Sequence, residues 1–81
     1  MTALNKLRWR CRRGTLELDM MLMRYLEHRY PEADELERQT FLQLLDLEDS
    51  ELMSYLMGER VPTTKEFVGL VTTIRSLPAE F

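Results

Sequence analysis

The chain has 81 residues, a formal net charge of −3 and a hydrophobic fraction of 44%. This length fits one domain, and no apolar run reaches the roughly 18–20 residues that a membrane-spanning helix needs. Cys11 is the single cysteine, which excludes an internal disulfide and fits a reducing compartment. The N-terminus is rich in arginine but has no apolar signal core, and the chain is short for a domain preceded by a transit peptide. We therefore expect a soluble, cytoplasmic globular protein.

The spacing of apolar residues predicts five helices and no strands. The expected helices span residues 3–12, 16–30, 34–47, 50–57 and 64–77. Connections of a few residues between helices favour neighbours that run antiparallel. The predicted fold is therefore all-α, a compact five-helix antiparallel bundle, with residues 1–81 forming a single domain.

The first helix has one narrow apolar stripe, made of Leu4, Leu7 and Cys11. Trp9 lies off this stripe. Gly14 is expected at the C′ position after the helix, where a left-handed backbone favours glycine. Thr15 is expected to cap the second helix, whose apolar residues cover most of its circumference. Such a helix is typically central and packed on several sides.

The later helices carry start and stop signals. Asp34 and Glu37 form a D-x-x-E start for the third helix, and Asp49 is the expected cap of the fourth. The segment Thr63-Thr64-Lys65-Glu66 reads as a capping box for the fifth helix. The expected helix stops are Pro31, Gly58 and Pro78.

The sequence has few residues arranged as catalysis or metal binding would require. Nucleophilic catalysis needs a nucleophile beside a base, but nothing in the sequence positions Cys11 against His28, the one histidine. Cys11 is expected in the core. The sequence has no paired cysteines or histidines at metal-ligand spacing and no glycine-rich phosphate loop. We predict no catalytic residue and no metal site, and we expect most of the six methionines to pack in the core.

Charge changes sign in the segment Arg12-Arg13-Gly14-Thr15-Leu16-Glu17. Residues 1–13 carry five basic residues and no acid, whereas residues 14–81 carry the other six basic residues and all 14 acids. The segment can be a capped helix end, a nucleic-acid arm or an interface for a protein partner. Glu17 favours the protein partner, because a phosphate backbone offers nothing to match a carboxylate.

The stretch Trp9-Arg10-Cys11-Arg12-Arg13-Gly14-Thr15-Leu16-Glu17-Leu18-Asp19 resembles the W-x-x-R-R-G-x-x-E-L-D signature of the SdhE-type assembly factors. These factors promote covalent flavin attachment to the flavoprotein subunit of succinate dehydrogenase and of fumarate reductase. The resemblance covers about residues 5–75 and continues in Glu27-His28, Phe41-x-x-Leu44-Leu45, Asp49-x-x-Leu52 and Tyr55-Leu56-Met57-Gly58. Tyr55 is a departure, because many members have tryptophan there.

The resemblance implies a bacterial five-helix factor that binds the apo-flavoprotein and is not an enzyme. It implies that Arg13, Gly14 and Glu17 lie against the flavoprotein, near its flavin-linked histidine. The other partner-binding residues that it implies are Arg12, Trp9, Asp19, Glu27 and His28. FAD would belong to the partner, with no cofactor bound tightly by this chain.

We further expect a monomer in which Arg13 and Glu17 point outward on one side of Gly14. Two alternatives stay open. One is an antitoxin-like or regulatory module, since some members of the family carry that label. The other is a small nucleic-acid-binding protein that uses the basic first helix.

Overall fold

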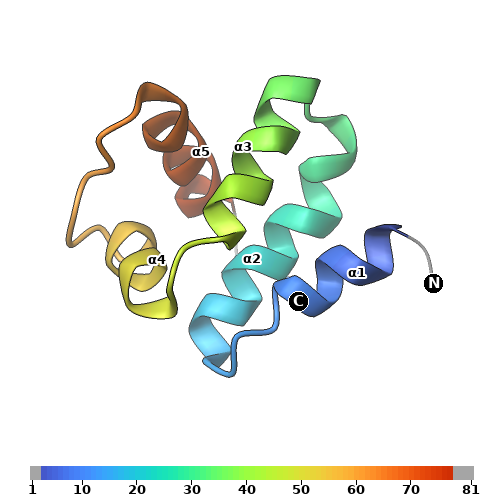
Figure 1. The fold of residues 1–81 in the computed structure, drawn as a ribbon, viewed down its shortest axis with the longest axis horizontal. Helices are drawn as coiled ribbons and strands as arrows, with labels where there is room; N and C mark the ends of the chain where they lie inside the picture. The colour runs from blue at the N-terminus through green and yellow to red at the C-terminus, as the bar shows by residue number, and fades with distance from the viewer. Residues whose placement is uncertain (1–2, 78–81) are drawn as a thin grey trace.

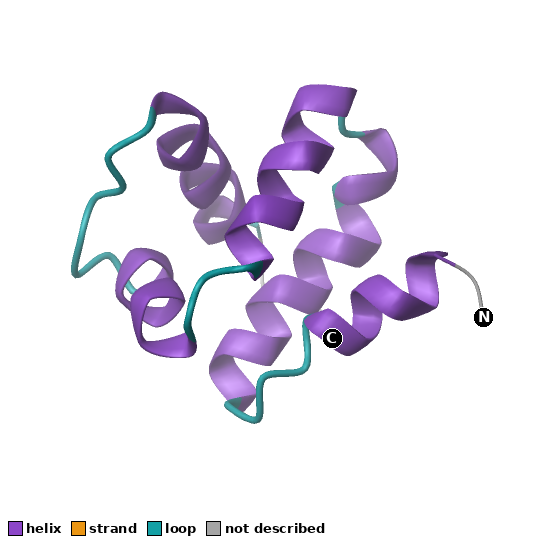
Figure 2. Cartoon of the chain, viewed as in Figure 1, coloured by secondary structure: helices purple, strands orange, loops and turns teal. Residues whose placement is uncertain are grey.

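The computed structural model describes residues 3–77, and every regular element in this range is helical (Figures 1 and 2). The five α-helices are α1 (Ala3–Arg10), α2 (Leu16–His28), α3 (Glu35–Leu45), α4 (Asp49–Leu56) and α5 (Lys65–Ser76), and a short 3-10 helix, η1 (Tyr30–Glu32), follows α2. The predicted all-α class is therefore confirmed. Within residues 3–77, each helix is too short or too polar to cross a lipid bilayer.

Helices α2 and α5 connect the other elements. Helix α2 contacts α1, η1 and α5, and α5 also packs against α3 and α4. In Figure 1, α1 lies beside the middle of α2, on the side away from α4 and α5. The buried residues of α2 are Leu18, Leu22, Tyr25 and Leu26. One side of the helix therefore packs in the core, and the opposite side does not.

An aromatic cluster closes the end of the core beside η1. The rings of Tyr25 and Phe41 lie 4.6 Å apart, and the Tyr30 ring lies 5.7 Å from Phe41. The Tyr25 hydroxyl donates to Glu37 Oε2 at 2.7 Å, and Arg29 Nε donates to the same oxygen at 3.2 Å. The hydrogen bond from Arg29 lowers the pKa of Glu37, while burial and the bond to Glu37 raise the pKa of Tyr25. A charged carboxylate therefore satisfies the buried phenol.

Several helix ends differ from the predicted bounds. Helix α2 ends at His28 rather than at residue 30, because Pro31 lies in the first turn of η1 and restricts the residues before it. The Asp34 side chain accepts a bond from the Glu37 amide, as the start signal predicts. At α5, however, the capping side chain is Thr64, which accepts from the Phe67 amide. The predicted stop at Pro78 lies outside the described residues.

Helix α4 departs further from the prediction. Its N-cap is Glu48, whose side chain makes no capping bond, and Asp49 is already inside the helix. The predicted capping role of Asp49 is wrong, because its carboxylate binds Arg13 instead. At the other end, Gly58 has a φ of +78°, the Gly58 amide bonds to the Tyr55 carbonyl and the Glu59 amide bonds to the Ser54 carbonyl. These bonds form the Schellman arrangement that glycine favours.

The packing predicts how two leucines of α2 differ in their effect on stability. Leu22 is 0% exposed, so Leu22→Ala should lower the free energy of unfolding by about 3 kcal/mol through lost burial and a residual cavity. Leu16, on the same helix, is 77% exposed, so Leu16→Ala should change it by less than about 0.5 kcal/mol. Urea unfolding followed by circular dichroism measures both. Equal effects would contradict the placement of α2.

Candidate partner-binding site

The loop between α1 and α2 is held by the carboxylate of Asp19. Helix α1 ends at Arg10, two residues before the predicted end. The amides of Arg13 and Gly14 do not continue it but donate to the Asp19 carboxylate, at 2.7 Å and 3.3 Å. Asp19 lies in the first turn of α2, where a negative charge suits the helix dipole. Thr15 occupies the predicted N-cap position, but its side chain makes no capping bond.

Gly14 has the left-handed backbone predicted for it, but not at the predicted place. Its φ is +87°, a conformation that costs free energy for residues with a Cβ atom. It lies four positions beyond the last residue of α1, in the middle of the loop rather than at the helix C′ position. An added Cβ would meet no atom within 4 Å. Glycine is therefore used here for its backbone freedom.

Arg13 does not point outward, so that expectation is wrong. Its side chain is 14% exposed, and its Nε donates to Asp49 Oδ1 at 2.7 Å. Its terminal nitrogens donate to three backbone carbonyls, those of Arg10, Leu45 and Leu47. Carbonyls at helix ends carry partial negative charge and suit a guanidinium. Arg13 therefore ties the loop to the end of α3 and the start of α4.

Glu17 behaves differently from Arg13. It lies in the first turn of α2 and is exposed. Within residues 3–77 its carboxylate has no hydrogen bond or ion pair, and it is Asp49 that holds the Arg13 guanidinium. The outward orientation expected for Glu17 agrees with this exposure. The two charged residues of the signature therefore have different surroundings.

Two hollows that share lining residues lie on the surface of α1, α2 and the loop between them. The larger, about 370 Å³, is lined by Arg12 of the loop and by residues of α2 from Leu16 to His28. The smaller, about 280 Å³, is lined by Trp9 and other residues of α1. Arg12 and Met23 line both hollows, so the two form one surface.

We call this surface the α1–α2 face and define it by seven lining residues. These are Trp9, Arg12, Leu16, Met20, Met23, Glu27 and His28. It contains four of the eight predicted partner-binding residues, and a fifth, Asp19, also lines the larger hollow. Arg13, Gly14 and Glu17 do not line either hollow.

The α1–α2 face is partly apolar. Trp9 is 64% exposed and Leu16 is 77% exposed, so the face carries two large exposed apolar side chains. Apolar residues that gather on one surface are typical of interaction sites. The apolar residues Leu16, Met20 and Met23 of this face were not predicted as site residues. Met23 also packs against the core, as do Met21, Met53 and Met57, which agrees with the core packing expected for most of the methionines. Residues 16, 20, 23 and 27 follow a helical repeat of three to four, so they share one side of α2. That spacing, away from the core stripe, is the signal that could have found them.

Cys11 lies in the core, as its place on the apolar stripe of the first helix predicts. Its side chain is 0% exposed, and burial raises the pKa of the thiol to about 11. The protonated thiol is a poor nucleophile at neutral pH. His28 is exposed, and no bond between the two side chains is found in residues 3–77. The same part of the chain has no cluster of acids, histidines and cysteines that could hold a metal ion.

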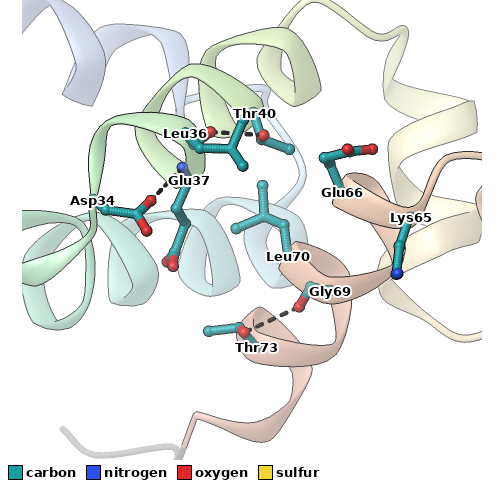
Figure 3. A pocket seen from close by; sticks show the side chains of 9 residues that line it. All are labelled: Asp34, Leu36, Glu37, Thr40, Lys65, Glu66, Gly69, Leu70 and Thr73. Atoms are coloured by element: carbon teal, nitrogen blue, oxygen red, sulfur yellow. Dashed lines mark hydrogen bonds between the residues drawn. The ribbon is translucent and has the colours of Figure 1, made fainter.

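A further hollow lies between α3 and α5 and contains none of the predicted site residues (Figure 3). Its volume is about 290 Å³. The hydroxyl of Thr40 donates to the Leu36 carbonyl and that of Thr73 to the Gly69 carbonyl, as the dashed lines in Figure 3 show. The polar groups of these threonines are therefore already satisfied within their helices.

Comparisons with known proteins agree with the resemblance. Residues 5–78 match the family described as flavinator of succinate dehydrogenase. The chain belongs to this family. The FAD assembly factor SdhE of Xylella fastidiosa strain 9a5c is 54% identical over 76 residues, 94% of this chain and 78% of the relative. The proteins of that name from Methylococcus capsulatus and Coxiella burnetii are 42% and 40% identical, over 95% and 93% of this chain and 93% and 92% of the relatives.

The predicted family is thereby confirmed, and the expected assembly-factor class agrees with the names of these relatives. The residues of the signature differ in their surroundings. The side chain of Arg13 is mostly buried, Gly14 has a left-handed backbone, and Glu17 is exposed.

Gly14 and Gly69 should respond in opposite directions to the same substitution. Gly14→Ala forces a Cβ atom onto a φ of +87° and should lower the free energy of unfolding by about 1 kcal/mol. Gly69 lies inside α5 with open space around it, so Gly69→Ala should raise it by about 0.5–1 kcal/mol. Thermal unfolding of the two variants tests this, and a stabilising Gly14→Ala would refute the positive φ.

Arg13 and Glu17 should also separate by stability. Arg13→Ala leaves Asp49 and three backbone carbonyls without their donor and should lower the free energy of unfolding by about 2 kcal/mol. Glu17→Ala removes an exposed carboxylate and should change it by less than about 0.5 kcal/mol. Urea unfolding measures both. A silent Arg13→Ala would mean that its guanidinium is free in solution.

Proposed function

We propose that this chain is an FAD assembly factor that binds the apo-flavoprotein subunit of succinate dehydrogenase and promotes covalent attachment of FAD to it. Family membership supports the role, and the names of the relatives support the cofactor. The observation that carries the proposal is the α1–α2 face. It offers exposed Trp9 and Leu16 together with the charges of Arg12 and Glu27. Exposed Glu17 directly follows Leu16 in the chain.

The chemistry of flavin attachment explains why a binding surface is enough. The histidine that bonds to the flavin and the flavin itself both belong to the flavoprotein, so the factor supplies no nucleophile. Its contribution is to hold the flavoprotein with histidine and ring in near-attack geometry. The α1–α2 face suits this role, because it joins two helices that a bonded loop fixes relative to each other. A protein interface typically covers about 800 Å² on each partner.

We assign the predicted residues to two roles within this proposal. Those that touch the flavoprotein are Trp9, Arg12, Glu17, Glu27 and His28. Those that shape the loop behind them are Arg13, Gly14 and Asp19. FAD stays with the flavoprotein throughout, and this chain holds no cofactor tightly. We further propose that the factor acts as a monomer in the cytoplasm and that the fumarate reductase flavoprotein is a second partner.

The nucleic-acid alternative loses support from the ion pairs of the basic segment. Arg8 lies 3.5 Å from Glu27, Arg10 bonds to Asp46, and Arg13 bonds to Asp49. These pairs partly neutralise the positive charge that a phosphate backbone would need. Binding of DNA or RNA that weakens steeply with salt would revive this alternative.

Two exposed leucines provide a matched test. Leu16 lies on the α1–α2 face and Leu36 lies on α3, and they are 77% and 61% exposed. The flavoprotein is expressed with wild-type chain, with each leucine-to-alanine variant or with Glu17→Ala, and covalent FAD is read as fluorescence on a denaturing gel. Leu16→Ala and Glu17→Ala should reduce the signal about tenfold or more, as expected when an interface anchor is lost. Leu36→Ala should leave it unchanged.

Two outcomes would count against the proposal. If the wild-type chain does not increase the covalent FAD on the flavoprotein, the proposed function is wrong. Loss of signal with Leu36→Ala but not with Leu16→Ala moves the interface away from the α1–α2 face.

A further inference from the structure

Two arginines from the basic segment reach the same distant turn. Asp46 directly follows α3 and bonds to Arg10, whereas Asp49 is the first residue of α4 and bonds to Arg13. The carbonyls of Leu45, the last residue of α3, and of Leu47, in the turn between the two helices, also accept from Arg13. The basic segment and the acidic turn lie 36 residues apart in sequence for each side-chain pair. The position of one segment therefore depends on the other.

Asp49 occupies a position where a helix would use its carboxylate differently. It is the first residue of α4, beside an N-cap, Glu48, that makes no side-chain capping bond. A carboxylate here could serve the free amides of the first turn. Instead Asp49 Oδ1 accepts from Arg13 Nε at 2.7 Å. The Asp49 side chain therefore bonds to the loop between α1 and α2 and not to the first turn of its own helix.

Arg13 is held from both sides. Its backbone amide donates to Asp19 on α2, and its side chain donates to Asp49 on α4. Its side chain is 14% exposed, so an uncompensated charge there would be unfavourable. Gly14 follows directly with its left-handed φ, and Arg12 precedes it on the α1–α2 face. Moving Arg13 would therefore redirect the chain on both sides of it.

We propose that Asp49 is a positioning residue for the partner-binding site. By holding Arg13 inward, it sets the path of residues 11–15 and with it the orientation of Arg12, Leu16 and Glu17. Asp49 itself need not touch the flavoprotein, because it acts through Arg13. The role in partner binding rests on the proposed function, whereas the effect on the loop does not.

The first experiment uses the isolated chain and follows amide hydrogen exchange by NMR. The Arg13 and Gly14 amides bond to Asp19, not to Asp49, so a change in their exchange reports transmission through Arg13. Asp49→Asn should speed their exchange about tenfold or more relative to amides in the middle of α5. Asp49→Glu, which keeps the carboxylate, should restore part of the protection.

The matched control is Glu48→Gln. It removes the same charge one position earlier, and Glu48 is exposed and makes no capping bond. Exchange at Arg13 and Gly14 should stay at the wild-type rate in this variant. Wild-type exchange in Asp49→Asn, or equal acceleration in both variants, overturns the proposal whatever the flavoprotein does.

The second experiment measures affinity for the apo-flavoprotein in a double-mutant cycle of Asp49→Asn and Glu17→Ala. If Asp49 positions the loop, the fold-loss caused by Glu17→Ala should be clearly smaller in the Asp49→Asn background than in the wild type. Additive losses would mean that Asp49 supports the fold alone and would overturn the positioning role. A wild-type chain that binds no flavoprotein would contradict the proposed function. The exchange experiment would still show whether Asp49 holds the loop in place through Arg13.

Discussion

The guanidinium of Arg13 is the constraint on which the arrangement of the signature loop depends. A charged side chain that is only 14% exposed is tolerated when its donors have acceptors, and here Asp49 and three backbone carbonyls accept from them. Two of those carbonyls and the carboxylate come from residues 45–49. The conformation of a five-residue loop near the N-terminus is therefore set by a turn in the middle of the chain.

Features governed by nearest neighbours were predictable from the sequence. Leu7 and Cys11 of the predicted apolar stripe lie in the core, and the fold class followed from the spacing of such residues. The Asp34 cap and the stop at Gly58 also form as predicted, because the bonds involved join residues three to five apart. The family followed from a signature in which most positions are contiguous.

Features set by distant contacts were not predictable in the same way. The residues next to Asp49 in sequence predict a helix cap, and those next to Arg13 predict an exposed helix end. Both predictions are wrong, because the two side chains bond to each other. The same limit applies to Met20 and Met23, because an apolar residue on a broadly apolar helix gives no local sign of whether another helix covers it. Both line the larger hollow, and Met23 also packs against the core.

The signature therefore combines two physical roles within five residues. Arg13 and Gly14 determine the path of the chain through a desolvated charge and a left-handed backbone, whereas Glu17 presents a carboxylate to solvent. Loss of function on substituting Arg13 cannot by itself identify a contact with the partner, since the same change releases the loop. Loss on substituting Glu17 is simpler to interpret, because its exposed side chain supports no bond in residues 3–77. A surface that must hold another protein in a defined geometry needs both roles, one to fix the loop and one to make the contact.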